Sequence, residues 1–206
     1  MHIYAFGSLC RGDVDQSSDV DLLALVSGHD DRFDPSVFSV YSYDRISVLW
    51  DDGSPFAWHL ATEAVLIYAS DGLDVLKRMG DPAAYDRQRA DCEKFRALFL
   101  EARLDLRLAS PTFVFDLSTI FLAIRNFASC YLLGKGVINF SRHAALHMGA
   151  QRVPLCKDDF SIFERARLLC TRGIGEPPSE SESNAAIKAA GDVEAWMIQL
   201  LEQVPA

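Results

Sequence analysis

The sequence lacks any cysteine pattern that would support a disulfide framework. Its five cysteines, in a chain of 206 residues, are scattered and include no C-x-x-C pair. A disulfide framework uses an even number of cysteines at short, recurring spacings. We therefore expect reduced thiols and a cytoplasmic protein. Cys130 lies in a strongly apolar segment and is expected in the core.

Positive charge is also scarce, because 20 Lys and Arg residues face 29 Asp and Glu residues, for a net charge of −9. This balance argues against nucleic-acid binding through a broad basic surface. The basic residues over 87–107 alternate with acidic ones three or four positions away, which is typical of a solvated helix face, with an RNA-contacting surface as the alternative. The residues concerned are Arg87, Arg89, Lys94, Arg96, Arg103, Arg107, Asp91, Glu93, Glu101 and Asp105.

No uninterrupted apolar run has the character of a membrane span. The most apolar stretch, 113–133, is long enough, but Asp116, Arg125 and Asn126 interrupt it, and charges at bilayer depth are unfavourable. We expect this stretch to be the central helix of a bundle. Met1 is followed almost at once by an apolar strand without a preceding basic region, so we also expect no signal peptide and no membrane partner.

The order of the elements predicts an α+β fold, with a small mixed β-sheet lobe over 1–80 and an all-helical bundle over 81–206. No internal repeat is visible, and 173–183 has the composition of an exposed loop. In the first lobe we expect strands over 3–6, 19–26, 37–42 and 64–69, and helices over 43–51 and 55–63. In the second lobe we expect helices over 83–109, 112–133, 140–148, 158–172 and 183–203.

The most informative stretch joins the first two strands. The first strand stops at Gly7-Ser8, and Asp19 and Asp21 stand where the second strand begins. Side chains two apart on a strand share a face, so both carboxylates could hold one Mg²⁺, while Val20 would point the other way into a core. Gly7 permits close approach to a phosphate, and Ser8 offers a hydroxyl and an N–H.

This constellation resembles the nucleotidyltransferase superfamily, which includes DNA polymerase β and the kanamycin-type and minimal nucleotidyltransferases. The family pattern stands here as Gly7-Ser8, Arg11-Gly12 and Ser18-Asp19-Val20-Asp21-Leu22. The resemblance is specific over 3–26, moderate over 37–69 and only architectural beyond about residue 80.

The resemblance implies in-line attack on the α-phosphate of a nucleoside triphosphate, assisted by bound metal ions. It assigns Asp19 and Asp21 to Mg²⁺, and Gly7 and Ser8 to the β- and γ-phosphates. Arg11 would either neutralise phosphate charge or lie on the surface of the following turn.

The sequence departs from the family pattern in two places. The family usually has a third carboxylate on the next strand, but Ser39 stands at the expected position, and Asp34 and Asp44 fit poorly. A helix commonly precedes the first strand and is not seen here. One face of the sheet should therefore be covered by the helical lobe or by another subunit, which points to an oligomer or a protein partner.

Three further features have two readings each. His59 and Glu63, at i and i+4, could contribute to a metal site, although we favour a local pair. His143 and His147 have the same spacing without an acidic companion nearby in sequence, and we favour a solvated helix face. Arg125 either pairs with a carboxylate, such as Asp116 or one from another helix, which we favour, or points between the lobes towards phosphate or acceptor.

These observations predict a Mg²⁺-dependent nucleotidyltransferase that transfers NMP, with ATP the expected donor, to a hydroxyl group on a small molecule or a protein. The alternative is a catalytically weak or inactive nucleotide-binding protein with a regulatory or antitoxin-like role. The missing third carboxylate and the missing leading helix motivate that alternative. The acceptor and the base preference are not readable from the sequence.

Overall fold

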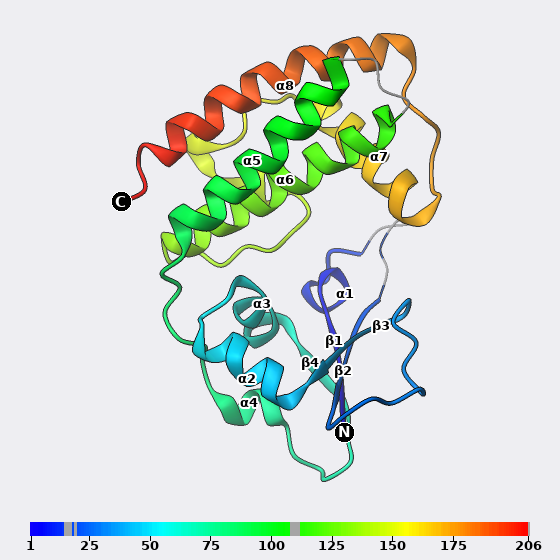
Figure 1. Ribbon diagram of the computed structural model, residues 1–206, viewed down its shortest axis with the longest axis vertical. Coiled ribbons are helices and arrows are strands. Elements are labelled where there is room, and N and C mark those ends of the chain that lie inside the picture. Colours follow the sequence, from blue (N-terminus) through cyan, green and yellow to red (C-terminus); the bar gives the residue numbers. More distant parts are fainter. Residues whose placement is uncertain (15–17, 19, 108–111, 206) are drawn as a thin grey trace. The chain divides into compact units, whose positions relative to one another are not determined.

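A computed structural model describes residues 1–14, 18, 20–107 and 112–205. The chain divides into two compact units, Met1–Asp86 and Arg87–Ala206. The first unit contains a small mixed sheet with helices, and the second is helical, so the fold is α+β as predicted (Figure 1).

The sheet of the N-terminal unit has the strand order β3-β2-β1-β4. β1 pairs with both β2 and β4 in antiparallel fashion, and β2 pairs with β3 in parallel. The strands are β1 (His2–Phe6), β2 (Asp21–Val26), β3 (Phe38–Ser42) and β4 (Val65–Ala69). The four strands lie close to their predicted places, although β2 begins at Asp21 rather than at residue 19.

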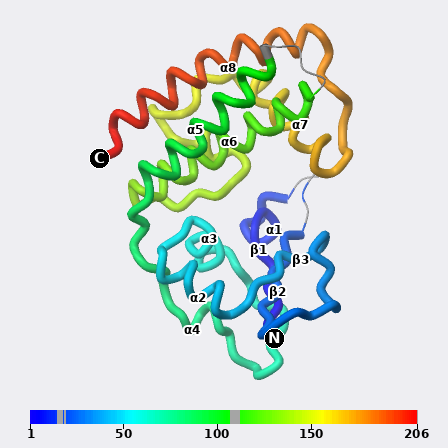
Figure 2. The backbone as a smooth tube through the Cα atoms, in the orientation of Figure 1, coloured from blue at the N-terminus to red at the C-terminus, as the bar shows by residue number. Residues whose placement is uncertain are grey.

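Four short helices lie in the described part of this unit, and the last three of them pack on one face of the sheet; the backbone can be followed through them in Figure 2. They are α1 (Ser8–Arg11), α2 (Tyr43–Asp51), α3 (Pro55–Glu63) and α4 (Val75–Met79). Polar residues begin three of them, because the side chains of Ser42, Ser54 and Asp74 each accept a hydrogen bond from a backbone N–H in the first turn. The buried cluster on this face consists of Tyr4, Phe6, Leu23, Leu25, Ile46, Trp50, Ala57, Leu60 and Leu76.

The other face of the sheet is covered in part by the segment between β2 and β3. Phe33 from that segment packs with Ala24 and Val26, and Ile3 and Phe38 lie at the edge of this cluster. On the edge strand β4, Val65 and Ile67 remain 55% and 58% exposed. The sequence suggested two covers for this face, the helical lobe or another subunit, and the inter-strand segment was not foreseen.

The C-terminal unit is built around one long apolar helix. It contains α5 (Gln88–Arg107), α6 (Phe113–Gly134), η1 (Ala144–His147), η2 (Gly149–Gln151), α7 (Lys157–Arg172) and α8 (Glu180–Leu201). α6 packs against α5, α7 and α8, and its Leu117, Ile120 and Phe127 are fully buried. Among the described residues, one helix, α6, is long enough and apolar enough to cross a membrane. In the structure, 61% of its most apolar window is buried.

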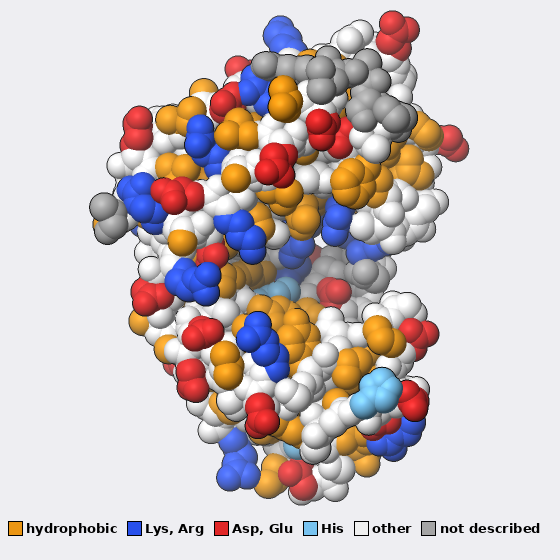
Figure 3. Space-filling view, viewed as in Figure 1, with side chains coloured by type: hydrophobic (Ala, Val, Ile, Leu, Met, Phe, Trp, Pro, Cys, Tyr) orange, Lys and Arg blue, Asp and Glu red, His pale blue; other side chains and the backbone are white. Residues whose placement is uncertain are grey.

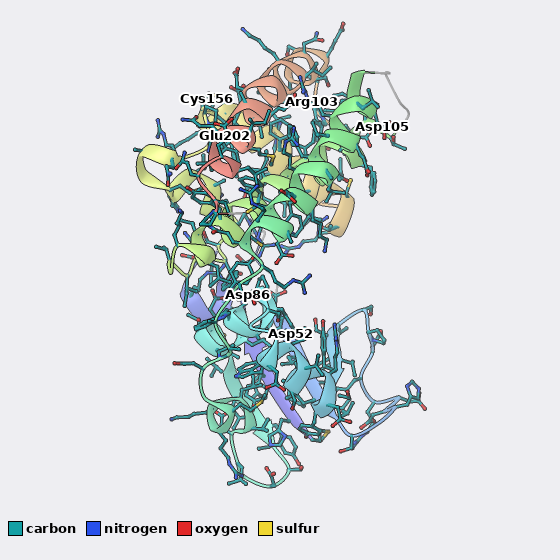
Figure 4. The ribbon with its side chains drawn as sticks, turned by 60° about the vertical axis from the view of Figure 1, so that its left-hand side comes forward. Asp52, Asp86, Arg103, Asp105, Cys156 and Glu202 are labelled. Carbon is teal, nitrogen blue, oxygen red and sulfur yellow. The ribbon has the colours of Figure 1, made fainter. Side chains whose placement is uncertain are left out.

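The charged residues of α5 follow the expected mixed pattern. Acidic and basic side chains are interspersed on the face of the molecule shown in Figure 3. Arg89 pairs with Glu93 one turn along the helix, and Arg103 pairs with Glu194 of α8. Arg103 and Asp105 are labelled on α5 in Figure 4.

Several predicted helix boundaries in this unit are wrong. α5 begins at Gln88 rather than at residue 83, and its expected end at 108–109 lies outside the described residues. In place of a helix over 140–148, the chain forms two 3₁₀ turns, η1 and η2. Gly149, the first residue of η2, has φ 58°, which is unfavourable for other residues. α8 begins at Glu180, because Ser179 and Glu182 form a capping box within the predicted loop.

Burial separates the five free cysteines into three classes, and Cys10 alone among them is partly buried. Cys92 and Cys130 are 0% and 3% exposed, and burial raises the pKa of the Cys92 thiol, whereas Cys156 and Cys170 are exposed. The core position predicted for Cys130 is confirmed.

We expect iodoacetamide at neutral pH to label Cys156 and Cys170 in the folded chain, and to label Cys92 and Cys130 only after denaturation, because the thiolate is the reactive form. Peptide mass spectrometry after labelling with and without guanidinium would measure this. Rapid labelling of Cys92 in the folded chain would contradict the described packing of α5 on α6.

Candidate functional site

The turn after β1 adopts a backbone conformation that only glycine tolerates well. Gly7 has φ 79° and ψ −150°, and its carbonyl oxygen accepts hydrogen bonds from the N–H groups of Cys10 and Arg11 at 3.1 and 3.2 Å. These bonds close the single turn of α1, which the sequence did not predict. Gly12, also at positive φ, ends that turn.

Asp21 lies beside this turn. Its register partner across the β1–β2 ladder is Phe6, the residue immediately before Gly7. A Cβ atom placed on Gly7 would collide with Oδ2 of Asp21, so the carboxylate occupies the space that a side chain would need. The structure therefore brings together three of the predicted site residues, Gly7, Ser8 and Asp21.

Asp19, the second predicted metal ligand, lies outside the described residues. The prediction that Val20 points into a core is wrong, because Val20 is 53% exposed and precedes the first residue of β2. The alternation argument therefore applies from Asp21 onwards, where Leu23 and Leu25 share its face and are buried.

Arg11 is held by acidic side chains. Its Nη1 donates to Oε2 of Glu63 at 2.5 Å, and its Nε donates to Asp13 at 3.1 Å. His59 Nε2 lies 2.8 Å from the same Glu63 oxygen. The local pair favoured for His59 and Glu63 is confirmed, but its third member, Arg11, was not foreseen, because 52 residues separate Arg11 from Glu63.

The Glu63 carboxylate is strongly buried. The exposed fractions of the Glu63, His59 and Arg11 side chains are 6%, 12% and 21%. The His59 ring also contacts the edge of Phe6, with ring centroids 5.5 Å apart. The cluster formed by Arg11, His59 and Glu63 therefore lies on the helix-covered face of the sheet, next to the Gly7–Ser8 turn.

The pKa of Cys10 is affected by the charged residues of this region. Its pKa is raised chiefly by burial, then by the negative charge of Glu63 and, further down, of Asp21, while Arg11 opposes the shift. A thiol with a raised pKa is a poor nucleophile at neutral pH, so the geometry does not favour cysteine chemistry here.

The parallel pairing of β2 with β3 shows which residues of β3 share the face of Asp21, where a third carboxylate would be expected. Leu23 pairs with Ser39, so Ser39 shares the face of Asp21 and Leu23. Asp34 lies before β3, where its side chain accepts from the Ser36 N–H at 2.8 Å, and Asp44 lies in the first turn of α2. β3 therefore supplies no carboxylate on this face, in agreement with the sequence.

The donor set near Gly7 suits an ion that is held partly by its substrate. Among the described residues, no group of three or more His, Cys, Asp or Glu side chains could hold a metal ion. Magnesium, however, is commonly held by one or two carboxylates together with substrate phosphates. Asp21, with Asp19 two positions before it in the chain, fits that second mode.

One prediction about the C-terminal unit is corrected. His143 does have an acidic companion, because its Nε2 lies 3.1 Å from Glu164 of α7. Asp116 accepts from Thr112, and burial raises its pKa. Arg125 donates to the Phe140 carbonyl at 3.1 Å, and its pairing with a carboxylate stays a prediction.

Comparison with known proteins gives one match to a family. Residues 2–75 match the family model described as "Nucleotidyltransferase domain". The match covers β1 to the start of α4, and so includes the Gly7–Ser8 turn and Asp21. No curated protein matched the chain.

Proposed function

Residues 2–75 of this chain form a nucleotidyltransferase domain, and from this premise we propose that the protein transfers AMP from ATP, with Mg²⁺, to a hydroxyl group. The family match supports nucleotidyl transfer in general. The choice of ATP, of Mg²⁺ and of a hydroxyl acceptor on a small molecule or a protein is our proposal.

One observation carries the proposal: the Asp21 carboxylate fills the space over Gly7 where any other residue would have a side chain. Gly7 is buried and Ser8 is partly buried beside this oxygen ligand. Phosphate groups are bound well by backbone N–H groups where no side chain intervenes.

We propose the following roles for the residues of the site. Gly7 and Ser8 would hold the β- and γ-phosphates through their N–H groups and the Ser8 hydroxyl. Asp19 and Asp21 would hold Mg²⁺, which, when bound, neutralises the charge on the phosphate oxygens. The acceptor oxygen then forms a bond to the α-phosphorus while the bond to the leaving pyrophosphate breaks. Arg11 was predicted to bind phosphate as well, but its ion pair with Glu63 supports a different role, argued below.

We further propose that residues 1–80 are the catalytic domain and 81–206 a bundle that selects the acceptor. We also propose a cytoplasmic location, no membrane or nucleic-acid partner, and an oligomer or a protein partner. The exposed Val65 and Ile67 of the edge strand β4 support the last of these.

Release of pyrophosphate tests the proposed reaction. We expect the chain to release pyrophosphate from ATP, more than from GTP, CTP or UTP, when Mg²⁺ and a pool of hydroxylated small molecules or candidate proteins are supplied. Label from α-³²P-ATP should appear on the acceptor, and EDTA should stop both signals. Pyrophosphate release that EDTA does not affect would contradict the role of Mg²⁺.

A second candidate function is supported by the absence of a carboxylate on the site-facing side of β3. The metal nearer the acceptor would then be held weakly, and no residue of β3 could take the acceptor proton. The protein would bind nucleotide as a regulatory or antitoxin-like partner. Nucleotide binding without any label transfer would favour this candidate, whereas robust turnover would exclude it.

A further inference from the structure

We propose that Glu63 is a positioning residue, which sets the Gly7–Ser8 turn by holding Arg11 and His59 at once. This inference rests on the proposed function, because it assigns Glu63 to the support of the phosphate-binding turn. It also revises the role expected of Arg11, from binding phosphate directly to anchoring α1.

The helix α1 has few contacts within itself to hold it in place. It is a single turn of four residues, none of which is buried, and Leu9 within it is 44% exposed. Isolated helices of this length are not stable in water. Side-chain contacts are therefore needed to hold the turn in position, and Arg11 makes two of them, one to the buried Glu63 and one to the exposed Asp13.

Two chains of contacts connect Glu63 to the region of Gly7, one through Arg11 and one through His59. The Arg11 side chain is bonded to Glu63, and the Arg11 N–H is bonded to the Gly7 carbonyl at 3.2 Å. The other donor to Glu63 is His59, whose ring contacts Phe6, the neighbour of Gly7 in the chain. Arg11 thus contacts Gly7 itself, and His59 contacts the preceding residue, Phe6. Asp21 also limits the position of Gly7.

The buried Glu63 carboxylate depends on its two partners for its stability. A carboxylate that is only 6% exposed is unfavourable unless it is paired, and here a single oxygen accepts from two donors. Charge-assisted hydrogen bonds of this kind are short, and an Arg–carboxylate pair has a fixed geometry. Removing the charge from Glu63 should therefore loosen Arg11 and, with it, the turn.

Kinetics of Glu63→Gln would test the inference. We expect this variant to raise KM for ATP·Mg²⁺ about tenfold, as is typical for loss of a supporting contact, with kcat changed by less than about threefold. Arg11→Gln should have a similar effect, and the double variant Glu63→Gln/Arg11→Gln should lose no more than the worse single variant. Glu194→Gln, which removes the partner of Arg103 in the C-terminal unit, is the matched control and should leave KM unchanged.

A second measurement does not depend on activity. Hydrogen exchange of the nucleotide-free chain should show faster exchange at the Cys10 and Arg11 amides in Glu63→Gln than in the wild type and in Glu194→Gln. If the wild type binds no nucleotide, the proposed function fails, and this comparison alone still decides whether Glu63 positions the turn.

Two results would overturn the inference. Wild-type exchange at these amides in Glu63→Gln, with or without a lower Tm, would limit Glu63 to a general stabilising role. A loss in Arg11→Gln that is much larger than in Glu63→Gln, and additive in the double variant, would show that Arg11 contacts the phosphates directly.

Discussion

Gly7→Ala should lower kcat/KM for ATP by at least about 100-fold, because two effects act at the same position. The backbone of Gly7, at φ 79° and ψ −150°, lies in a region that costs other residues about 1–3 kcal/mol. The new Cβ would also collide with Oδ2 of Asp21 and displace the carboxylate. Steady-state kinetics would measure the loss, and circular dichroism would show whether the helices remain folded.

Gly12→Ala is the matched control for this prediction. Gly12 also has a positive φ, 78°, but no atom lies within 4 Å of an added Cβ. We expect it to show only the effect of backbone strain, about tenfold or less in kcat/KM. Equal losses in the two variants would mean that the contact with Asp21 has no part in the effect.

Asp21→Asn should lower kcat by about 10²–10³-fold, as is typical when one group that stabilises charge in the transition state is removed. Asparagine has nearly the same shape as aspartate, so the packing beside Gly7 is kept while the negative charge is lost. The Mg²⁺ concentration needed for half-maximal rate should rise at the same time. A titration of the rate with Mg²⁺ at saturating ATP would measure both changes.

Asp52→Asn provides the control for charge alone. Asp52 is exposed at the end of α2 in the same unit and is labelled in Figure 4. Asp52→Asn changes the net charge by the same amount as Asp21→Asn. Because Asp52 lies outside the proposed site, we expect the kcat and the Mg²⁺ dependence of this variant to match those of the wild type. An Asp21→Asn variant that behaved like Asp52→Asn would remove Asp21 from the site.

The sequence predicted the parts of the fold that depend on local signals. The apolar stretch over 64–69 became β4, and Ser54-Pro55 began α3 at the expected place. The signal for the start of α8 was present as well, since Ser179 and Glu182 have the spacing of a capping box, but the polar composition around them favoured a loop. At the start of α8, the capping-box spacing was therefore a better indicator of the structure than the polar composition.

The remaining differences come from contacts between distant residues. Neither the pairing of Arg11 with Glu63 nor that of His143 with Glu164 could be inferred from spacing, because each joins separate elements. The exposure of Val20 has the same cause, since alternation predicts a buried side chain only where a strand has begun. At the site, the sequence predicted Gly7, Ser8, Arg11, Asp19 and Asp21. The contact of Arg11 with Glu63 came from the structure, and the role proposed for Glu63 rests on it.

Isothermal titration of the chain with ATP·Mg²⁺ tests the central claim most directly, in parallel with the double variant Asp19→Asn/Asp21→Asn. The claim predicts saturable binding by the wild type that is weakened at least about tenfold in the double variant, and that is lost when EDTA replaces Mg²⁺. Binding of equal affinity in both chains would place the nucleotide elsewhere and contradict the assignment.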